Sequence, residues 1–422
     1  MPKTRRVQEP IRSSTSKVCF LYHHTRDSPG LSLSHTRGVK RYGRYIFRIR
    51  RTILLNPRLI IALLSFGLAG VLAGCTPNEP DGPPPNFTLT DPNIEGHLHE
   101  GDSTVVAQPQ ENPDRSFHGE RWTLAWRHEL QQHSTMLQIT TDPDESRLYI
   151  LDMAAPHVTV LNARDGRYLD QFGEGPGEGP GEFVQPERIT IAHDGHLLIP
   201  DSRRRVIHVF AEDGRFVQAI PVGNVGPVDV VAADSGFFWI HAGTPAAIAT
   251  LYDGEGDRLR DAGVFSREIP AGMGKNGYLL RHPNRPSMFY VGRFGGRLSK
   301  FTLEGDLRFH RQTIDPNDYP APVALSGGES FTMDQSNVHA LRALAGVTDE
   351  GVYVGIIQTV EEPSSGLRFL VDRYDPETGD YLYSYDSPNP DCTIVWMTDA
   401  HVYTHCPLDS SIERWRRAPD QP

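Results

Sequence analysis

Cysteine is scarce in this sequence of 422 residues, and hydrophobic runs long enough to span a membrane are lacking. There are 4 cysteines and 7 methionines. The apolar run at residues 59–72 is too short for a hydrocarbon core of about 30 Å at about 1.5 Å per residue. The glycine-rich run at residues 173–181 lacks the Gly-Lys-Ser/Thr ending of a phosphate-binding loop, and no helical pattern follows it. We therefore expect no transmembrane helix at the first run and a connecting loop at the second.

Basic residues are scarce in most of the chain. Residues 1–74 contain 14 Lys and Arg against 2 Asp and Glu, whereas residues 75–422 contain 28 against 51. The net charge of −11 hides this division. Because an acidic surface repels phosphate backbones, we expect no nucleic-acid partner for the larger part. The position of the basic part favours a targeting signal over a nucleic-acid-binding arm.

The basic segment leads into a short motif that ends at a cysteine. Arginines precede the apolar run 59–72, whose length suits the hydrophobic region of a signal peptide. The next residues, Leu72-Ala73-Gly74-Cys75, resemble the lipobox of bacterial lipoproteins. The resemblance implies cleavage before Cys75, lipidation of that cysteine and anchoring to a membrane of the cell envelope. Thr76, in place of Asp, implies the outer membrane, with the protein facing the periplasm or the cell surface.

The residues around this motif leave the export route open. A buried helix carrying a cysteine is the alternative to a lipobox, but five prolines follow between residues 77 and 85 and argue against it. Arg50-Arg51 also resembles part of a twin-arginine signal, so either that route or the general secretory route is compatible with the sequence. Residues 76–120 are rich in Pro, Asn, Asp and Gly and predict a disordered tether.

A repeat of 40 to 50 residues organises the rest of the chain. Residues 148–152 (LYILD), 157–161 (HVTVL) and Asp165-Gly166 match residues 197–201 (LLIPD), 206–210 (VIHVF) and Asp213-Gly214 at offsets of 49 and 48 residues. Asp-Gly between short β-rich runs predicts a hairpin. The first hairpin turns of the successive units are expected near Asp144, Asp194, Ser235, Asn284, Glu350 and Asp399, spaced 50, 41, 49, 66 and 49 residues apart. The long gap predicts an insertion around residues 315–345.

The repeat count predicts an all-β fold, a six-bladed β-propeller of four-stranded antiparallel blades. Six units fit the sequence, and the last lacks its fourth strand. Residues 121–126 form an extra β-rich run before the first unit. We expect this N-terminal strand to complete the last blade and close the ring. The predicted organisation is residues 1–74 as N-terminal extension and signal peptide, 75–120 as lipidated cysteine and tether, and 121–418 as propeller.

One stretch carries a family resemblance. Residues 175–183 (GPGEGPGEF), 186–189 (PERI), Asp194-Gly195, 205–210 (RVIHVF) and Asp213-Gly214 resemble an NHL-type repeat. The chain is therefore similar to bacterial lipoproteins with six-bladed propellers and NHL-like repeats. The match is specific over residues 173–220 and loose elsewhere, so the resemblance implies a fold more strongly than an activity.

Two cysteines remain after the lipidation site. Cys392 and Cys406 are equidistant from the expected turn near Asp399 and should face each other across two strands. Export places them in an oxidising compartment, so we expect a disulfide, with a pair of buried thiols as the alternative.

Few residues of the expected propeller are candidates for catalysis or metal binding. Asp152, Asp201, His241 and His405 lie at or near the ends of second strands, beside the expected mouth of the central channel. No metal-ligand spacing stands out among them, and the two aspartates favour capping of backbone groups. Aromatic residues in the strands, Trp239, Phe289, Tyr290 and Tyr353, are interpreted as core. We assign no catalytic, cofactor-binding or metal residue.

Two hypotheses of function follow from these expectations. The first is a binding module whose partner is a protein, a peptide or a glycan. The alternative is a metal-dependent hydrolase or lyase acting at the channel mouth, as in the lactonases and the amidating lyase among propellers. A fold alone does not decide between them.

Overall fold

The computed structural model describes most of the chain after residue 106. The described residues are 107–111, 114–119, 121–131, 137–223, 226–233, 238–241, 248–263, 277–316, 321–324, 331–334, 340–360 and 366–418. They all belong to one unit of the chain, Ile53–Pro422. The expected signal peptide, Cys75 and the tether up to residue 106 lie outside the described residues. No helix in the described part has the length and apolarity needed to cross a membrane.

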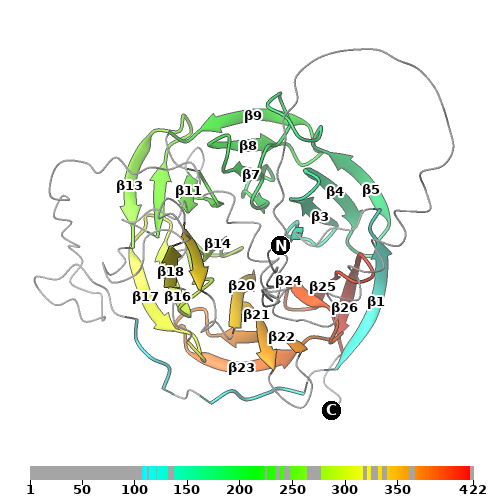
Figure 1. The fold of residues 1–422 in the computed structure, drawn as a ribbon, viewed down its shortest axis with the longest axis vertical. Helices are drawn as coiled ribbons and strands as arrows, with labels where there is room; N and C mark the ends of the chain where they lie inside the picture. The colour runs from blue at the N-terminus through cyan, green and yellow to red at the C-terminus, as the bar shows by residue number, and fades with distance from the viewer. Residues whose placement is uncertain are drawn as a thin grey trace, which may run out of the picture. The chain divides into compact units, whose positions relative to one another are not determined.

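Six four-stranded antiparallel sheets are arranged as the blades of a β-propeller (Figure 1). Blade 1 contains β2 (Leu137–Thr141), β3 (Arg147–Asp152), β4 (His157–Asn162) and β5 (Tyr168–Phe172). Blade 2 contains β6 (Thr190–Ile191), β7 (Leu197–Asp201), β8 (Val206–Phe210) and β9 (Phe216–Pro221). Blade 3 contains β10 (Asp229–Ala232), β11 (Phe238–His241), β12 (Ala249–Tyr252) and β13 (Arg258–Ala262).

The second half of the ring follows the same plan. Blade 4 contains β14 (Gly277–Arg281), β15 (Ser287–Gly292), β16 (Arg297–Thr302) and β17 (Leu307–Gln312). Blade 5 contains β20 (Ala340–Val347), β21 (Val352–Val360), β22 (Gly366–Tyr374) and β23 (Tyr381–Asp386). Blade 6 contains β24 (Thr393–Met397), β25 (His401–Cys406), β26 (Ser411–Arg417) and β1 (Trp122–Glu129). The fold predicted from the repeats is confirmed.

The N-terminal strand closes the ring as expected. β1 pairs antiparallel with β26, with Trp122 opposite Arg417 and Glu129 opposite Ser411. Trp126 is buried, and its Nε1–H donates to the carbonyl of Ala163 in blade 1 at 2.9 Å. The closing strand therefore joins the last blade to the first.

The Asp-Gly turns explain part of the repeat. Gly166 and Gly214 have φ values of 72° and 81°, in the left-handed region that glycine adopts readily. A Cβ added at Gly166 would lie 2.7 Å from the ring of Trp126, and one at Gly214 would lie 2.7 Å from the ring of Phe172. Glycine at these turns is thus required by both the backbone and the packed aromatic side chains.

The hydrophobic core is divided among the interfaces between neighbouring blades. Between blades 1 and 2, for example, Tyr149 and Leu151 pack with Ile199 and Phe210. Comparable clusters lie between the other pairs of blades. The four aromatic residues interpreted as core, Trp239, Phe289, Tyr290 and Tyr353, are each at most 1% exposed, which confirms that interpretation.

The expected insertion lies between blades 4 and 5. It contains a separate two-stranded sheet of β18 (Ala321–Ala324) and β19 (Phe331–Asp334). Blade 5 begins at Ala340, so the insertion ends a few residues earlier than the sequence spacing indicated.

Residues before β1 also contact the propeller. Residues 107–111 and 114–119, which together we call the strap, run along the outermost strands β17 and β23 (Figure 1, cyan). Gln108 forms a parallel bridge with Arg311, and Phe117 forms one with Ser384. These residues were assigned to the predicted tether, whose last part is therefore held against the outer rim of blades 4 and 5.

Candidate functional site

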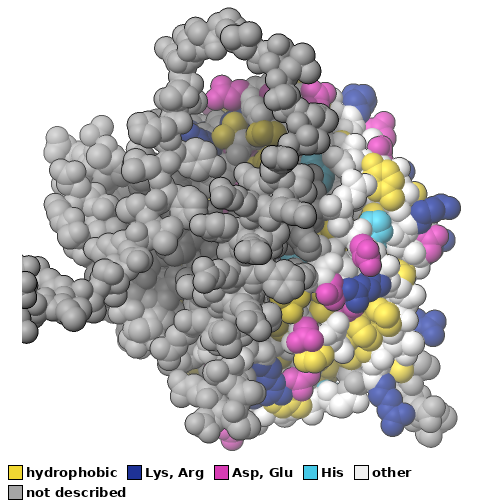
Figure 2. Space-filling view, turned by 45° about the vertical axis from the view of Figure 1, so that its right-hand side comes forward, with side chains coloured by type: hydrophobic (Ala, Val, Ile, Leu, Met, Phe, Trp, Pro, Cys, Tyr) yellow, Lys and Arg dark blue, Asp and Glu magenta, His cyan; other side chains and the backbone are white. Residues whose placement is uncertain are grey.

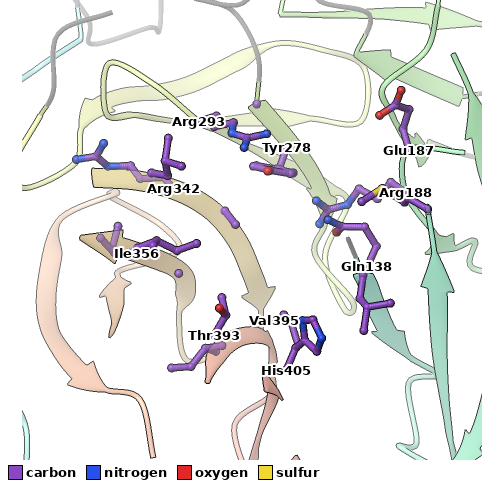
Figure 3. Close-up of a pocket in the computed structure, with 18 of the residues that line it drawn as sticks. Gln138, Glu187, Arg188, Tyr278, Arg293, Arg342, Ile356, Thr393, Val395 and His405 are labelled. Carbon is purple, nitrogen blue, oxygen red and sulfur yellow. The ribbon is translucent and has the colours of Figure 1, made fainter. Parts of the chain in front are cut away.

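A cavity of about 170 Å³ lies in the central channel, where the innermost strands begin (Figure 3). Its lining comes from all six blades. The lining residues are Leu137, Gln138, Met153, Glu187, Arg188, Val228, Gly277, Tyr278, Arg293, Leu341, Arg342, Ala343, Gly355, Ile356, Ile357, Leu370, Thr393, Ile394, Val395 and His405. The lining thus combines apolar residues with three arginines, one glutamate and one histidine.

The two faces of the propeller differ in their connections. Strands alternate in direction within a blade, so the fourth strand ends on the face where the next innermost strand begins. The chain passes from one blade to the next on this face, between β5 and β6, β9 and β10, β13 and β14, β17 and β20, and β23 and β24. The opposite face carries tight turns such as Asp165-Gly166 and Asp213-Gly214. Gln138, Tyr278 and Thr393 line the cavity near the beginnings of innermost strands, so the cavity lies toward the face with the long connections, which we call the loop-bearing face.

The glycine-rich connection brings two charged residues to the cavity. It links β5 to β6 and is held by Arg204, whose guanidinium donates to the carbonyls of Glu178 at 2.7 Å and Glu182 at 2.9 Å. Glu187 and Arg188 follow at its end and line the cavity. The expectation of a connecting loop is confirmed.

Arg188 lies between a buried carboxylate and an aromatic ring. Its Nε lies 3.3 Å from Oδ2 of Asp229, and its Cζ is 4.9 Å from the centre of the Tyr278 ring. Asp229 is 1% exposed and accepts hydrogen bonds from the backbone N–H groups of Leu279 at 2.7 Å and Val230 at 2.8 Å. Burial raises the pKa of Asp229 to about 6, and the charge of Arg188 opposes this shift.

Glu187 is the carboxyl group of the cavity wall. Its Oε1 accepts hydrogen bonds from Ser202 Oγ at 2.5 Å and Gln185 Nε2 at 2.9 Å. Burial is the largest influence on this group and raises the pKa of Glu187, while the charge of Arg293 acts in the opposite direction. A raised pKa means that Glu187 keeps its proton to a higher pH than an exposed glutamate does.

Arg293 and Arg342 reach the cavity from neighbouring blades. Arg293 follows β15, and its carbonyl accepts a hydrogen bond from the backbone N–H of Arg342 at 3.3 Å. Figure 3 shows Arg293, Tyr278 and Arg188 together on one side of the cavity, with the guanidinium of Arg342 pointing away from them. Arg188 and Arg293 therefore lie beside the same aromatic ring, that of Tyr278.

The guanidinium of Arg342 is buried between blades 4 and 5. The residue is 1% exposed, and its Nη2 donates to the carbonyls of Ile314 at 3.4 Å and of Asp315. Burial lowers the pKa of Arg342. Within the described part of the chain, its Nε and Nη1 have no hydrogen-bond partner.

The candidate residues named from the sequence have different roles. Asp152 Oδ1 accepts from the N–H groups of Ala154 at 2.9 Å and Ala155 at 3.0 Å. Asp201 accepts from the N–H groups of Val184 at 2.7 Å and Arg204 at 2.9 Å. Both aspartates therefore cap loops, as expected.

The two candidate histidines differ in their place. His405 lines the cavity. His241 ends β11, and its side chain lies outside the described part. Sequence reasoning assigned no site role to the four charged residues of the wall, although Glu187 and Arg188 belong to the motif that resembles an NHL repeat.

Cys392 and Cys406 are joined by a disulfide in the structure. The sulfur atoms are 1.98 Å apart and the Cα atoms 4.3 Å apart. The bond lies beside the pair Thr393 and His405, which are opposite each other in β24 and β25. These cysteines and Glu413 are also the one group of three potential metal ligands found among the described residues.

The charges on the visible exterior differ from those of the cavity wall. Figure 2 shows basic, acidic and hydrophobic side chains interspersed on the described part of the face turned to the viewer. The cavity wall instead has three arginines and a single carboxyl group. The described lining thus contains more basic than acidic residues.

The similarity of this chain to known proteins is one of structure. No protein-family model and no curated protein matches this chain. Among solved structures, a protein of Bacteroides fragilis described as exported is 11% identical with a TM-score of 0.46, over 71% of this chain and 87% of its own. A member of the DUF4221 family from Bacteroides vulgatus is 6% identical with a TM-score of 0.48, over 71% and 99%. Virginiamycin B lyase from Staphylococcus aureus is 12% identical with a TM-score of 0.43, over 70% and 99%. None of these likenesses is close enough to carry a function to this chain.

Proposed function

We propose that this protein is an exported, lipid-anchored binding module, and that the loop-bearing face of its propeller holds a protein, peptide or glycan partner. The observation that carries the proposal is the position of the cavity on the face with the long connections. Loops on a rigid scaffold are the usual place for binding residues. The lipobox at Leu72-Ala73-Gly74-Cys75 supplies the anchor in this proposal.

The metal-dependent alternative fits the cavity less well. Among its described lining residues, Glu187 and His405 are the carboxyl and imidazole groups, and three arginines share the same wall. A divalent cation would be repelled by the guanidinium groups of Arg188 and Arg293. Metal analysis of the purified mature protein tests this choice, and stoichiometric calcium or zinc would count against the binding module.

A cavity-blocking substitution tests the binding face. Gln138→Trp adds a large ring to the cavity wall, whereas Gln171→Trp adds the same ring to the exposed outermost strand β5. Partner capture by the full lipoprotein, after cross-linking in the cell envelope, should be lost with Gln138→Trp and kept with Gln171→Trp. Capture that survives both substitutions equally would contradict the proposal.

The anchor is tested separately at Cys75. The Cys75→Ala protein should fail to incorporate labelled palmitate and should move from the membrane fraction to the soluble fraction. Retention of label and membrane association would contradict lipidation at this cysteine.

A further inference from the structure

We propose that the central cavity takes one uncharged, ring-sized apolar side chain of the partner. The inference rests on the proposed function and deepens it, because it names the group that enters the binding face and favours a protein or peptide over a glycan. It starts from the lining, where several apolar side chains remain partly exposed inside the channel.

The partly exposed apolar side chains come from different parts of the ring. Met153 follows β3 in blade 1, and Val228 precedes β10 of blade 3. Ile357 lies in β21 of blade 5, and Val395 lies in β24 of blade 6 (Figure 3). All four line the cavity and are half-buried, whereas Val230 in the core of blade 3 is 0% exposed. Because burial of apolar surface is favourable, a group that covers these four side chains gains free energy from each of them.

Two of the arginines in the lining already hold partners. The Nε of Arg188 lies 3.3 Å from Oδ2 of the buried Asp229. The guanidinium of Arg342 points away from Arg188 in Figure 3 and donates to the carbonyls of Ile314 and Asp315. An anionic ligand would therefore compete with a buried carboxylate for Arg188, and it would not reach the donors of Arg342.

The carboxyl group of the lining is also compensated. Glu187 accepts hydrogen bonds from Ser202 and Gln185, and the charge of Arg293 acts on it. The described charged groups of the lining thus balance one another or are held by the surrounding protein. A charged ligand would lose its hydration here without a matching gain, which is costly. An uncharged ligand avoids this cost.

The size of the cavity matches a single ring. Its volume of about 170 Å³ is comparable to the roughly 150 Å³ cavity that accommodates benzene. Two small residues, Ala343 and Gly355, lie opposite each other in β20 and β21, and both belong to the lining. A sugar ring has a similar size, but its hydroxyl groups would lose water against the apolar side chains. The ring of an aromatic side chain therefore suits the cavity better.

Ligand-observed NMR with three small probes tests the inference. The full chain with Cys75→Ala is used, because without a lipid no detergent is needed that would compete for an apolar probe. Toluene, benzoate and benzylammonium share one ring and differ in charge. Toluene should bind at least roughly tenfold more tightly than either ion, because only the ions lose charge hydration in the cavity. No binding of toluene, or binding of either ion as tightly as toluene, would overturn the inference.

Matched valine variants locate the ring. Val395 is half-buried in the cavity wall, and Val217 is 39% exposed on the outermost strand β9. Threonine keeps the shape of valine and adds a hydroxyl group, which would lose water when a ring covers it. Val395→Thr should weaken toluene binding by roughly fivefold or more, and Val217→Thr should leave it unchanged. Toluene affinities that are equal in the two variants would place the ring outside the cavity and overturn the inference.

The two proposals fail in different ways. If Gln138→Trp abolishes partner capture while toluene does not bind to the Cys75→Ala protein, the inference about the ring is wrong and the binding face stands. If toluene binds and Val395→Thr weakens it, while partner capture is unaffected by Gln138→Trp, the apolar cavity site stands and the partner-binding face is wrong.

Discussion

Arg115 in the strap and Asp372 in β22 form a two-point ion pair across 257 positions of sequence. Arg115 donates through Nη2 to Asp372 Oδ2 at 2.9 Å and through Nε to Oδ1 at 3.1 Å. The side chain of Asp372 is 0% exposed. Arg115 also donates to Asp315 Oδ2 at 2.5 Å, and the carbonyl of Asp315 accepts from Arg342 in the cavity wall. Asp315 therefore connects the strap to the cavity wall, because it accepts hydrogen bonds from both Arg115 and Arg342.

Removal of Arg115 should therefore destabilise the propeller. Arg115→Met leaves the carboxylate of Asp372 buried without its cation, and breaking a buried pair in this way typically costs about 3–5 kcal/mol. Arg121→Met, at an exposed position before β1, should cost less than about 0.5 kcal/mol. Denaturant unfolding of the two variants checks the difference. The double variant Arg115→Met, Asp372→Asn should recover part of the loss, and a fully stable Arg115→Met protein would contradict the role of the pair.

Buried and exposed side chains of the closing strand β1 should contribute unequally to the stability of the propeller. Trp126 is buried and donates to Ala163, whereas Leu124 on the same strand is 44% exposed. Trp126→Ala should cost about 3–5 kcal/mol, and Leu124→Ala should stay within about 0.5 kcal/mol. Thermal unfolding of both variants measures this. Equal effects would mean that β1 does not close the ring through its buried side.

The disulfide should stabilise the last blade. Cys392 and Cys406 are 14 positions apart, and closure of a loop of about 15 residues contributes about 3 kcal/mol in the chain-entropy model. The double variant Cys392→Ser, Cys406→Ser should lose stability of that order. A thiol assay on the denatured, unreduced mature protein should find neither of these cysteines free. Two reactive thiols at these positions would contradict the pairing.

Asp229 should give the protein a component of stability that weakens as the pH rises. Its pKa in the folded protein is about 6, above the ordinary value of 3.8, so the folded state holds this proton more tightly than the unfolded chain. This group contributes up to about 3 kcal/mol to the free energy of unfolding. The contribution is fully present below about pH 4 and is lost as the pH rises through 6. Asp229→Asn removes the titration. Relative to the unaltered protein, this variant should therefore gain stability between pH 4 and pH 7, and a constant difference would contradict the raised pKa.

The repeat pattern was sufficient to predict the ring. Short β-rich runs separated by turns such as Asp165-Gly166 recur at nearly constant spacing, and the extra run near Trp122 fills the missing place in the last blade. Cys392 and Cys406 could be paired from the sequence for a similar reason, since a hairpin fixes which residues lie opposite each other.

The cavity and the strap could not be predicted in the same way. The cavity wall is assembled from six blades, and Arg188 and Arg293 reach it from connections that follow no periodic pattern. The strap has few apolar residues and resembles a linker in composition. It is held instead by polar contacts, such as those of Gln110 Nε2 with the carbonyls of Gln312 at 2.7 Å and Gly379 at 3.0 Å. Such contacts depend on partners that are distant in sequence.

The central claim is that the loop-bearing face holds the partner, and site-specific photo-cross-linking in the cell envelope tests it most directly. Met153 lies in a turn on that face and lines the cavity, whereas Glu304 is exposed in a tight turn on the opposite face. A photoreactive residue at position 153 should give a discrete cross-linked species that is absent when the residue is placed at position 304. Cross-linking from position 304 alone, or equally from both positions, would contradict the account.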